Sequence, residues 1–408
     1  MPAATAEDLD VPSGLAHVAT ASFLASRISP TAGFWIALAG GLALARIGQE
    51  RGARVGYGAS IAAMLQTVAV MGPIRFGVPF TQALTAPLLG RLEARGRPLS
   101  AQILACAAIR LVQTAIFVAF AVIVLVGGVD AYTDTYDSVA SWMPLLPEGT
   151  RAALIATAVG LLAWAAFAST VQVLVYRRGL HAWPLGSAHE LRDAGPEPSD
   201  PGHRRFDPRA VAIAAAIAFA LLLSSTTWPL LAAVAAWLAI AWWTARGDRD
   251  VVGVGLAITG TLALGIFVFA MIGGAGLDLA LRRAARASLL VLVATWLRSA
   301  AGAPGLREVS RRTLRRLRAL PATREASVVL DELGTGRQLA PAATSLLEEL
   351  RPVPKAPIPV LDAVFRWVVA ESSRFRAVPH DVALRLRARP LDGLLVLLAL
   401  APLAVLAA

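Results

Sequence analysis

The feature that most constrains this chain is a succession of apolar segments, each close to the length of a membrane-crossing helix. A helix needs about 20 mostly apolar residues to span the hydrocarbon core of a bilayer. Segments of this kind lie near residues 31–45, 55–72, 76–90, 107–128, 152–176, 209–226, 228–244, 251–275, 280–301 and 391–407. They predict an all-α polytopic membrane protein with about ten transmembrane helices.

The composition agrees with a multi-pass protein of the cell membrane, which in a bacterium is the inner membrane. Hydrophobic residues make up 57% of the chain and charged residues 16%, far from the balance of a soluble domain. One more stretch, residues 14–28, is amphipathic and ends just before Pro30. We expect this stretch to lie on the membrane surface rather than to cross the bilayer.

The charges of the connecting segments predict the orientation, because basic residues accumulate on the cytoplasmic side of a membrane protein. Residues 129–149 contain four acids and no base, so we expect them outside the cell. Residues 302–390 contain 16 basic and 9 acidic residues, so we expect them in the cytoplasm.

One module boundary is visible in the sequence. Residues 186–208 are rich in Pro, Gly, Asp and Ser, as is typical of a flexible linker, and we expect this linker in the cytoplasm. It separates an N-terminal transmembrane module of about five spans, residues 1–185, from a C-terminal transmembrane module, residues 209–301. Residues 302–390 then form a cytoplasmic region of amphipathic helices, and residues 391–408 form the final transmembrane helix.

The ionisable residues carry no enzyme signature. No Asp or Glu falls in the interior of a predicted span, since Asp278 and Asp392 are at span ends, whereas a proton- or sodium-coupled carrier needs carboxylates at mid-membrane. The histidines have no metal-ligand spacing, and the single cysteine, Cys106, excludes a multi-cysteine metal site. We therefore predict no catalytic residue, no metal site and no cofactor, and we expect any ATP hydrolysis to occur in another chain.

A few arginines do fall in apolar segments. We expect Arg110 to extend its guanidinium to the cytoplasmic membrane face. Arg282, Arg283 and Arg286 are expected to contact headgroups or to anchor a helix end, with a substrate-facing role as the alternative.

The segment 306–320 is amphipathic at helical spacing, with Leu306 and Leu314 on its apolar face. Five of its six basic residues are Arg311, Arg312, Arg315, Arg316 and Arg318. We expect these arginines to hold the helix at anionic lipids, each contributing about 1 kcal/mol near the surface. Nucleic acid is excluded as a partner because no aromatic-interleaved or helix-turn-helix pattern accompanies the arginines. Docking of a soluble protein stays open, since two further amphipathic helices are expected within 324–336 and 360–376.

The run LRRAARASLLVLVATWLRSAAGAPGLREVSRRTLRRLRALPATREASVVLDEL, residues 281–333, resembles the transmembrane T component of energy-coupling factor transporters, the ECF type of ABC transporter. The resemblance covers roughly residues 209–376. In that family, cytoplasmic coupling helices end in Ala-Arg-Gly-like motifs whose Arg docks into two ABC ATPases. The matching places here carry Arg337 after Gly336, and Arg374 with Arg376, without a true Ala-Arg-Gly. The resemblance implies that Arg337, with Arg374 or Arg376 as the second contact, docks the partner.

The predicted function is therefore that of a transporter subunit, which couples separate cytoplasmic ABC ATPases to uptake of a small molecule such as a vitamin or a metal ion. A substrate-binding membrane subunit is expected as a further partner, or its task is performed by residues 1–180. Two alternatives stay open. One is a membrane enzyme acting on a lipid-linked substrate, whose phosphate the basic region would bind; the other is a non-catalytic membrane scaffold.

Overall fold

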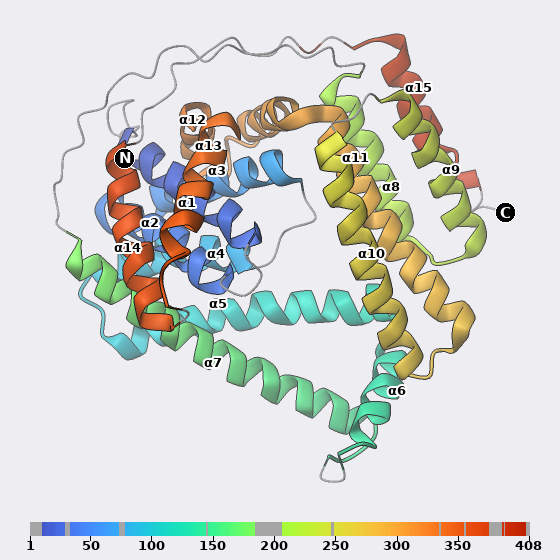
Figure 1. The fold of residues 1–408 in the computed structure, drawn as a ribbon, viewed down its shortest axis with the longest axis horizontal. Helices are drawn as coiled ribbons and strands as arrows, with labels where there is room; N and C mark the ends of the chain where they lie inside the picture. The colour runs from blue at the N-terminus through green and yellow to red at the C-terminus, as the bar shows by residue number, and fades with distance from the viewer. Residues whose placement is uncertain are drawn as a thin grey trace. The chain divides into compact units, whose positions relative to one another are not determined.

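The computed structural model is built from helices alone in the part of the chain that it describes. That part comprises residues 10–28, 33–72, 78–143, 146–183, 206–245, 249–333, 336–354, 356–374, 386 and 388–404. Of these residues 87% are helical, in 15 α-helices and one short π-helical segment, and none is in a strand (Figure 1). The predicted all-α fold class is confirmed.

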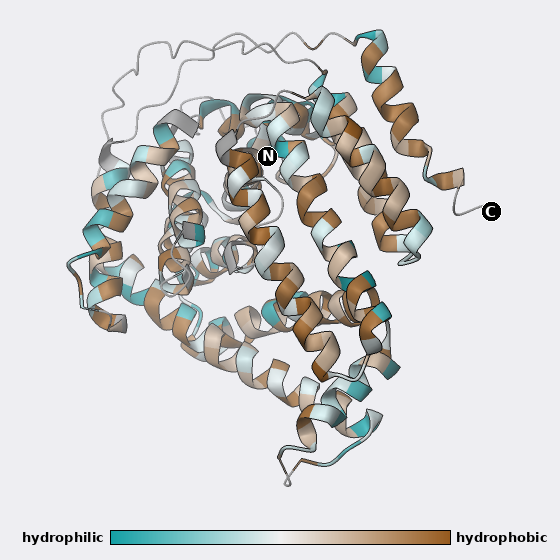
Figure 2. Cartoon of the chain, turned by 45° about the vertical axis from the view of Figure 1, so that its right-hand side comes forward, coloured by the Kyte–Doolittle hydropathy of each residue, from teal (hydrophilic) through white to brown (hydrophobic). Residues whose placement is uncertain are grey.

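Four helices in the described residues are long and apolar enough to cross a membrane. They are α5 (Leu99–Phe120) with its π-helical continuation η2 (Ala121–Val126), α7 (Thr150–Ala182), α10 (Arg249–Ile272) and α11 (Gly276–Arg316). Large apolar side chains are exposed along them, such as Leu104 at 73% and Phe269 at 69%, as on a lipid-facing helix. Figure 2 shows the hydrophobic colour running along these helices.

The remaining apolar segments are also helical, but they are shorter or less apolar. Three are short apolar helices, namely α8 (Pro208–Ser224), α9 (Trp228–Thr244) and α15 (Pro390–Leu400). The segments predicted at 31–45, 55–72 and 76–90 form α2 (Gly33–Arg51), α3 (Ala53–Met71) and α4 (Val78–Ala94), which belong to neither group. The structure thus supports four spans in its described part, and the predicted number of about ten is not confirmed.

The chain folds into two compact units, and the three unit boundaries in the described residues fall inside helices. Unit 1 contains Met1–Arg110, Ala165–Asp200 and Ala303–Leu384, and unit 2 contains Leu111–Trp164, Pro201–Gly302 and Arg385–Ala408. Each of the helices α5, α7 and α11 is divided, with one part in unit 1 and the other part in unit 2. The predicted linker 186–208 lies outside the described residues up to position 205.

Helix α1 (Asp10–Ile28) forms the centre of unit 1. Its residues 12–26 are buried, and it packs against α2, α3, α12 (Thr323–Glu332), α13 (Gly336–Leu350) and α14 (Pro357–Arg374). The expectation that residues 14–28 lie on the membrane surface is therefore wrong. The physical reason is that hydroxyl groups of α1 donate hydrogen bonds to carbonyl oxygens of the preceding turn of the same helix. Thr20 donates to Ala16 O at 2.8 Å, and Ser26 donates to Phe23 O at 2.8 Å. Such a helix can be buried on every side.

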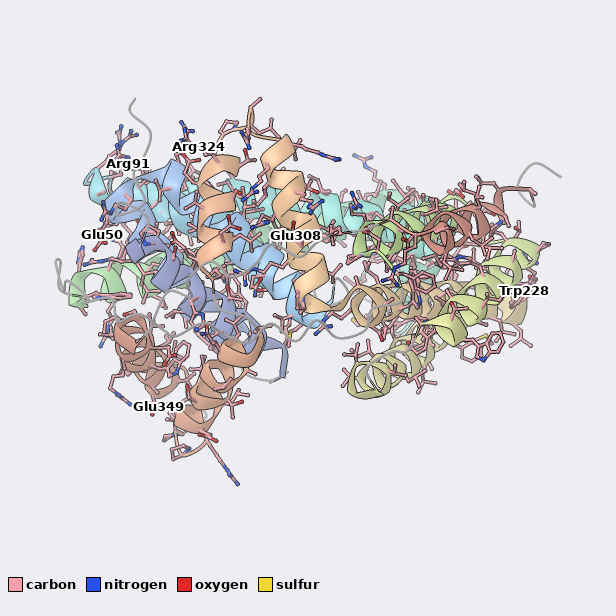
Figure 3. All side chains as sticks on the ribbon, turned by 90° about the horizontal axis from the view of Figure 1, so that it is seen from above. Glu50, Arg91, Trp228, Glu308, Arg324 and Glu349 are labelled. Carbon is pink, nitrogen blue, oxygen red and sulfur yellow. The ribbon has the colours of Figure 1, made fainter. Side chains whose placement is uncertain are left out.

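The amphipathic helices α12, α13 and α14 turn their apolar faces to this core. Ala326, Val329 and Leu330 of α12 are fully buried, on the face that the helical spacing predicts. Exposed charged side chains, among them Arg324 and Glu349, lie on the outer faces of α12 and α13 (Figure 3). Residues 303–384 thus pack with the N-terminal helices in one unit, since protein rather than lipid covers their apolar faces.

The helices α2 and α4 approach each other at backbone distance. A Cβ atom added to Gly90 of α4 would stand 1.8 Å from Ala45 O of α2, and one added to Gly48 would stand 2.3 Å from Pro87 O. Only glycine permits this approach.

Unit 2 contains α6 (Val129–Ala140) and the apolar helices α8, α9, α10 and α15. Asp392 joins two segments of it, because its Oδ1 accepts from Asp207 N at 2.8 Å and its Oδ2 accepts from Arg389 N at 2.6 Å. Ser138 Oγ of α6 donates to Ile272 O at the end of α10, at 2.6 Å. Helix α11 is kinked at its unit boundary, where Gly302 has φ 65° and Pro304 follows.

Candidate functional site

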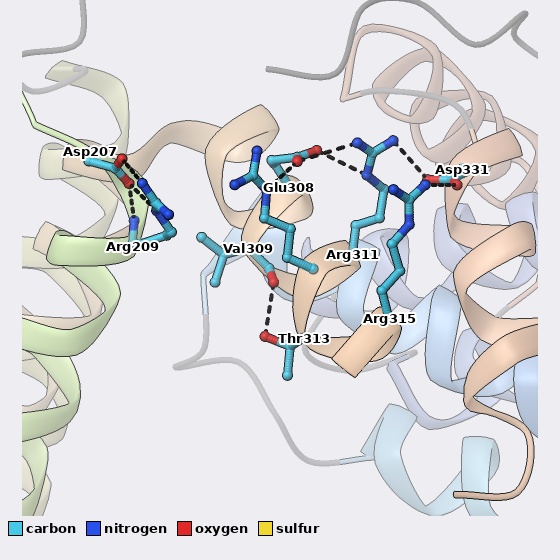
Figure 4. Close-up of polar contacts among 9 residues, drawn as sticks. Asp207, Arg209, Glu308, Val309, Arg311, Thr313, Arg315 and Asp331 are labelled. Carbon is cyan, nitrogen blue, oxygen red and sulfur yellow. Dashed lines mark hydrogen bonds and ion pairs between the residues drawn. The ribbon is translucent and has the colours of Figure 1, made fainter. Parts of the chain in front are cut away.

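An ion-pair cluster in unit 1 holds the arginine-rich end of α11 against α12 (Figure 4). Glu308 Oε1 accepts from Arg311 Nη2 at 3.3 Å and from Arg312 Nε at 2.7 Å, and its Oε2 lies 3.0 Å from Arg311 Nε as an ion pair. Asp331 of α12 accepts from Arg311 Nη1 at 3.5 Å and from Arg315 Nη2 at 3.4 Å. The cluster therefore links two helices through two carboxylates and three guanidinium groups.

The same end of α11 caps α12. Arg307 Nη2 donates to Leu330 O at 2.5 Å and to Asp331 O at 2.9 Å. Both carbonyls belong to the last turn of α12, where a helix leaves acceptors without an intrahelical donor and carries partial negative charge. The cation thus satisfies the helix end and strengthens the contact.

The cluster divides the five arginines that were predicted for the membrane surface. The side chains of Glu308 and Arg311 are 6% and 14% exposed, so their pairing is poorly screened by water. Arg316 and Arg318 are exposed and form no hydrogen bond or ion pair with described residues. Contact with anionic lipid stays a prediction for all five, and Arg316 and Arg318 are the two that the protein leaves uncommitted.

A further ion pair joins α12 to α3. Arg54 Nε lies 2.7 Å from Glu325 Oε1, whose side chain is 11% exposed. A Cβ atom on Gly58 of α3 would stand 2.6 Å from Glu325 Cβ, so the two helices are in direct contact. Helix α12 is therefore fixed on one side by α11 and on another by α3.

The predicted docking residues fall at helix ends. Arg337 lies in the first turn of α13, and Arg374 is the last residue of α14. Their side chains, and the whole of Arg376, lie outside the described residues. Partner docking through these arginines stays a prediction.

A buried polar network in unit 1, formed by α4, α5 and α7, was not expected from the sequence. Arg110 of α5 is 3% exposed; its Nη2 donates to Gln172 Oε1 at 2.5 Å and its Nε to Ser169 Oγ at 3.3 Å. Gln172 Nε2 in turn donates to Thr85 Oγ1 of α4 at 2.7 Å. Arg110 is thus held inside the protein, and the expected extension to the membrane face is wrong. The signal in the sequence was the pair Ser169 and Gln172, three residues apart in an apolar helix.

Glu93, at the end of α4, ties the same three helices together. It accepts from Gln102 Nε2 of α5 at 2.5 Å, and it pairs with Arg177 at 3.2 Å and His181 at 2.6 Å, both from α7. Burial raises the pKa of the Glu93 carboxyl, but the hydrogen bonds from Gln102 and His181 and the charge of Arg177 outweigh it, and the net pKa is lowered. The carboxylate is therefore a stable structural anion.

Unit 1 also has a pocket of about 210 Å³, open to the surface, between α2, α7 and α14. Apolar side chains such as Leu42 and Phe365 line most of it, and the exposed residues Arg178 and Asp362 also line it. A small apolar group would fit this space.

The described residues contain no group of three or more His, Cys, Asp and Glu side chains placed to hold a metal ion. The chain matches no protein-family model, and neither the curated proteins nor the solved structures give a match. The candidate site therefore consists of the basic end of α11 with α12, and its interpretation depends on its own geometry.

Proposed function

We propose that the protein is a membrane subunit of a transporter, similar to a T component, which couples separate cytoplasmic ATPases to uptake of a small molecule such as a vitamin or a metal ion. The observation that carries the proposal is the construction of α11. Its first part is a candidate membrane span, and its last part is the arginine-rich helix fixed to α12 by Glu308 and Asp331. A partner that displaces α12 would therefore act on the segment that directly follows a membrane span in the chain, with the non-helical Gly302 between the two as a hinge.

Counting crossings supports a cytoplasmic position for unit 1. The spans α5 and α7 flank residues 129–149, and α10 and α11 flank a short turn at 273–275. If α8 and α9 cross as a pair or not at all, the start of α5, the end of α7 and the end of α11 share one side. All three ends belong to unit 1, which carries 13 of the 16 basic residues of 302–390. Unit 1 is then the part that an ATPase could reach.

The experiment is purification of the tagged protein in a mild detergent, followed by identification of co-purifying chains and assay of ATP hydrolysis. We expect an ABC ATPase at constant stoichiometry. The double variant Arg337→Ala, Arg374→Ala should lose it, because truncating a docking arginine in an interface typically costs about 2 kcal/mol or more of binding.

The matched control is Arg318→Ala, which removes an exposed arginine from the other end of the basic region and should keep the partner. Retention of the ATPase by the double variant, or its absence from the wild-type preparation, would contradict the proposal. Co-purification of a lipid-linked substrate without an ATPase would favour the membrane enzyme. A preparation that contains neither an ATPase nor a lipid-linked substrate would favour the scaffold.

A further inference from the structure

Two buried arginines of unit 2 have no acceptor in the described part of the chain. Arg283 and Arg286 are 6% and 5% exposed and lie three residues apart, on one face of α11. The Nε atom of each is buried without a hydrogen-bond partner, and no described carboxylate pairs with either side chain. The two guanidinium groups instead act on each other as like charges.

The preceding residue, Arg282, has an unpaired Nε as well, but its terminal nitrogen finds an acid on the same helix. Arg282 Nη2 lies 2.6 Å from Asp278 Oδ2, and its guanidinium carbon lies 6.0 Å from the centre of the Trp228 ring. Trp228 Nε1 donates to Asp278 Oδ1 at 2.8 Å. The carboxylate of Asp278 is thus committed to Arg282 and Trp228.

An arginine cannot escape burial by losing its proton, so an uncompensated buried pair is costly. Arg283 lies next to Gly127, where an added Cβ would stand 3.2 Å from Nη2, and Gly127 has φ 99°, which favours glycine. The side-chain-free residue leaves room beside the guanidinium.

We propose that Arg283 and Arg286 bind a phosphate group. Two planar guanidinium forks on one helix face offer several N–H donors, and a phosphate has enough oxygens and negative charge to accept from both, which a single carboxylate does less well. The phosphate belongs either to an anionic phospholipid or to a phosphate-bearing solute. The site is separate from ATPase docking, since it lies in unit 2 and uses none of the docking residues.

The test uses the full chain, delipidated in a maltoside detergent that contains no phosphorus, with the melting temperature followed by tryptophan fluorescence. One arm adds phosphatidylglycerol, and the other adds inorganic phosphate against chloride at equal ionic strength. At a ligand concentration of about 100 times Kd, we expect the melting temperature to rise by about 5 °C or more. A rise with the lipid alone assigns a headgroup site, a rise with phosphate alone assigns a solute site, and a rise with both assigns a site for either.

The double variant Arg283→Gln, Arg286→Gln should lose this rise, whereas the control Arg282→Gln should keep it. Without added ligand, the double variant should melt no lower than the wild type, because removing uncompensated buried charges costs nothing, and a structural role predicts the opposite. If that variant fails to fold, Arg283→Lys with Arg286→Lys keeps the charges but loses the forks, and should bind at least about tenfold more weakly.

Three results would overturn the proposal: no rise in the wild type in either arm, a rise in the glutamine variant equal to that of the wild type, or an equal loss in Arg282→Gln. Binding by the lysine variant as tight as wild type would do the same.

Discussion

Replacing Glu308 by Gln should loosen α11 from α12 and lower the melting temperature of the protein. The substitution keeps the size of the side chain and removes its charge. Glu308 accepts from Arg311 Nη2 at 3.3 Å and from Arg312 Nε at 2.7 Å. In the variant both guanidinium groups lose their shared anion, and Arg311 keeps only Asp331, at 3.5 Å.

The size of the expected loss in the free energy of unfolding follows from how far the paired side chains are exposed. Breaking a fully buried ion pair costs about 3–5 kcal/mol, and exposed pairs contribute at most about 1 kcal/mol. Glu308 and Arg311 are 6% and 14% exposed, so their pair approaches the buried limit, whereas Arg312 is 38% exposed and screened by solvent. The glutamine oxygen can still accept one hydrogen bond, so we expect a loss of about 2 kcal/mol. In a unit of this size that corresponds to about 4–8 °C in melting temperature.

The assay is thermal unfolding in detergent, with Glu349→Gln as the matched control. Glu349 lies 4.0 Å from Arg366, and the two side chains are 47% and 65% exposed. That control should change stability by no more than about 0.5 kcal/mol. A Glu308→Gln variant that melts within about 1 °C of wild type, or a control that loses as much, would refute the reasoning from burial.

Three further predictions concern α1, the membrane orientation and the contact of α2 with α4. Burial lowers the pKa of His17 to about 4, so between about pH 6.5 and 4 the unfolded chain binds a proton that the folded chain does not. The free energy of unfolding should therefore fall by up to about 3 kcal/mol as the pH drops through that range. Melting curves at each pH should show this fall in the wild type and a much smaller one in His17→Leu. In a background free of the native cysteine, Ser141→Cys should react with an impermeant thiol reagent in intact cells, and Thr344→Cys should not. The reason is that we expect these exposed positions outside the cell and in the cytoplasm, respectively. The reverse labelling pattern would show that the orientation is inverted. Gly90→Ala should unfold at a clearly lower temperature because its methyl group would collide with a backbone oxygen 1.8 Å away, whereas Gly160→Ala, an exposed helical position with no atom within 4 Å, should be neutral or stabilising by up to about 1 kcal/mol.

The helices themselves could be predicted from the sequence, because apolar runs and helical periodicity are local properties. The spacing of Val329 and Leu330 placed them on a buried face, and the structure confirms it. The partner of that face could not be predicted, since the helices α1 and α3 that cover it lie some 260 residues or more earlier in the chain. Apolar content alone also cannot distinguish a lipid-facing span from a core helix such as α2, which is buried over most of its length.

The charged cluster was only partly visible in the sequence. The spacing of Glu308 and Arg312, four residues apart on a helix, predicts their pairing. The second acid, Asp331, belongs to another helix, so its contacts with Arg311 and Arg315 depend on the angle at which α12 returns. For the same reason a patch of arginines that indicates a lipid surface in the sequence is partly an internal contact in the structure.

The buried arginines of this chain can be compared by how each finds its acceptors. Arg110 uses the neutral oxygens of Gln172 and Ser169, and Arg311 uses two carboxylates. Both solutions bring the acceptor from the protein, so the folded state is complete without a ligand. Arg283 and Arg286 are buried as deeply as Arg110, yet no described residue supplies an acceptor to either. Because the described residues supply an acceptor to Arg110, Arg311 and Arg282 and none to this pair, an external anion would complete the site, and the phosphate test should discriminate between Arg282 and its two neighbours.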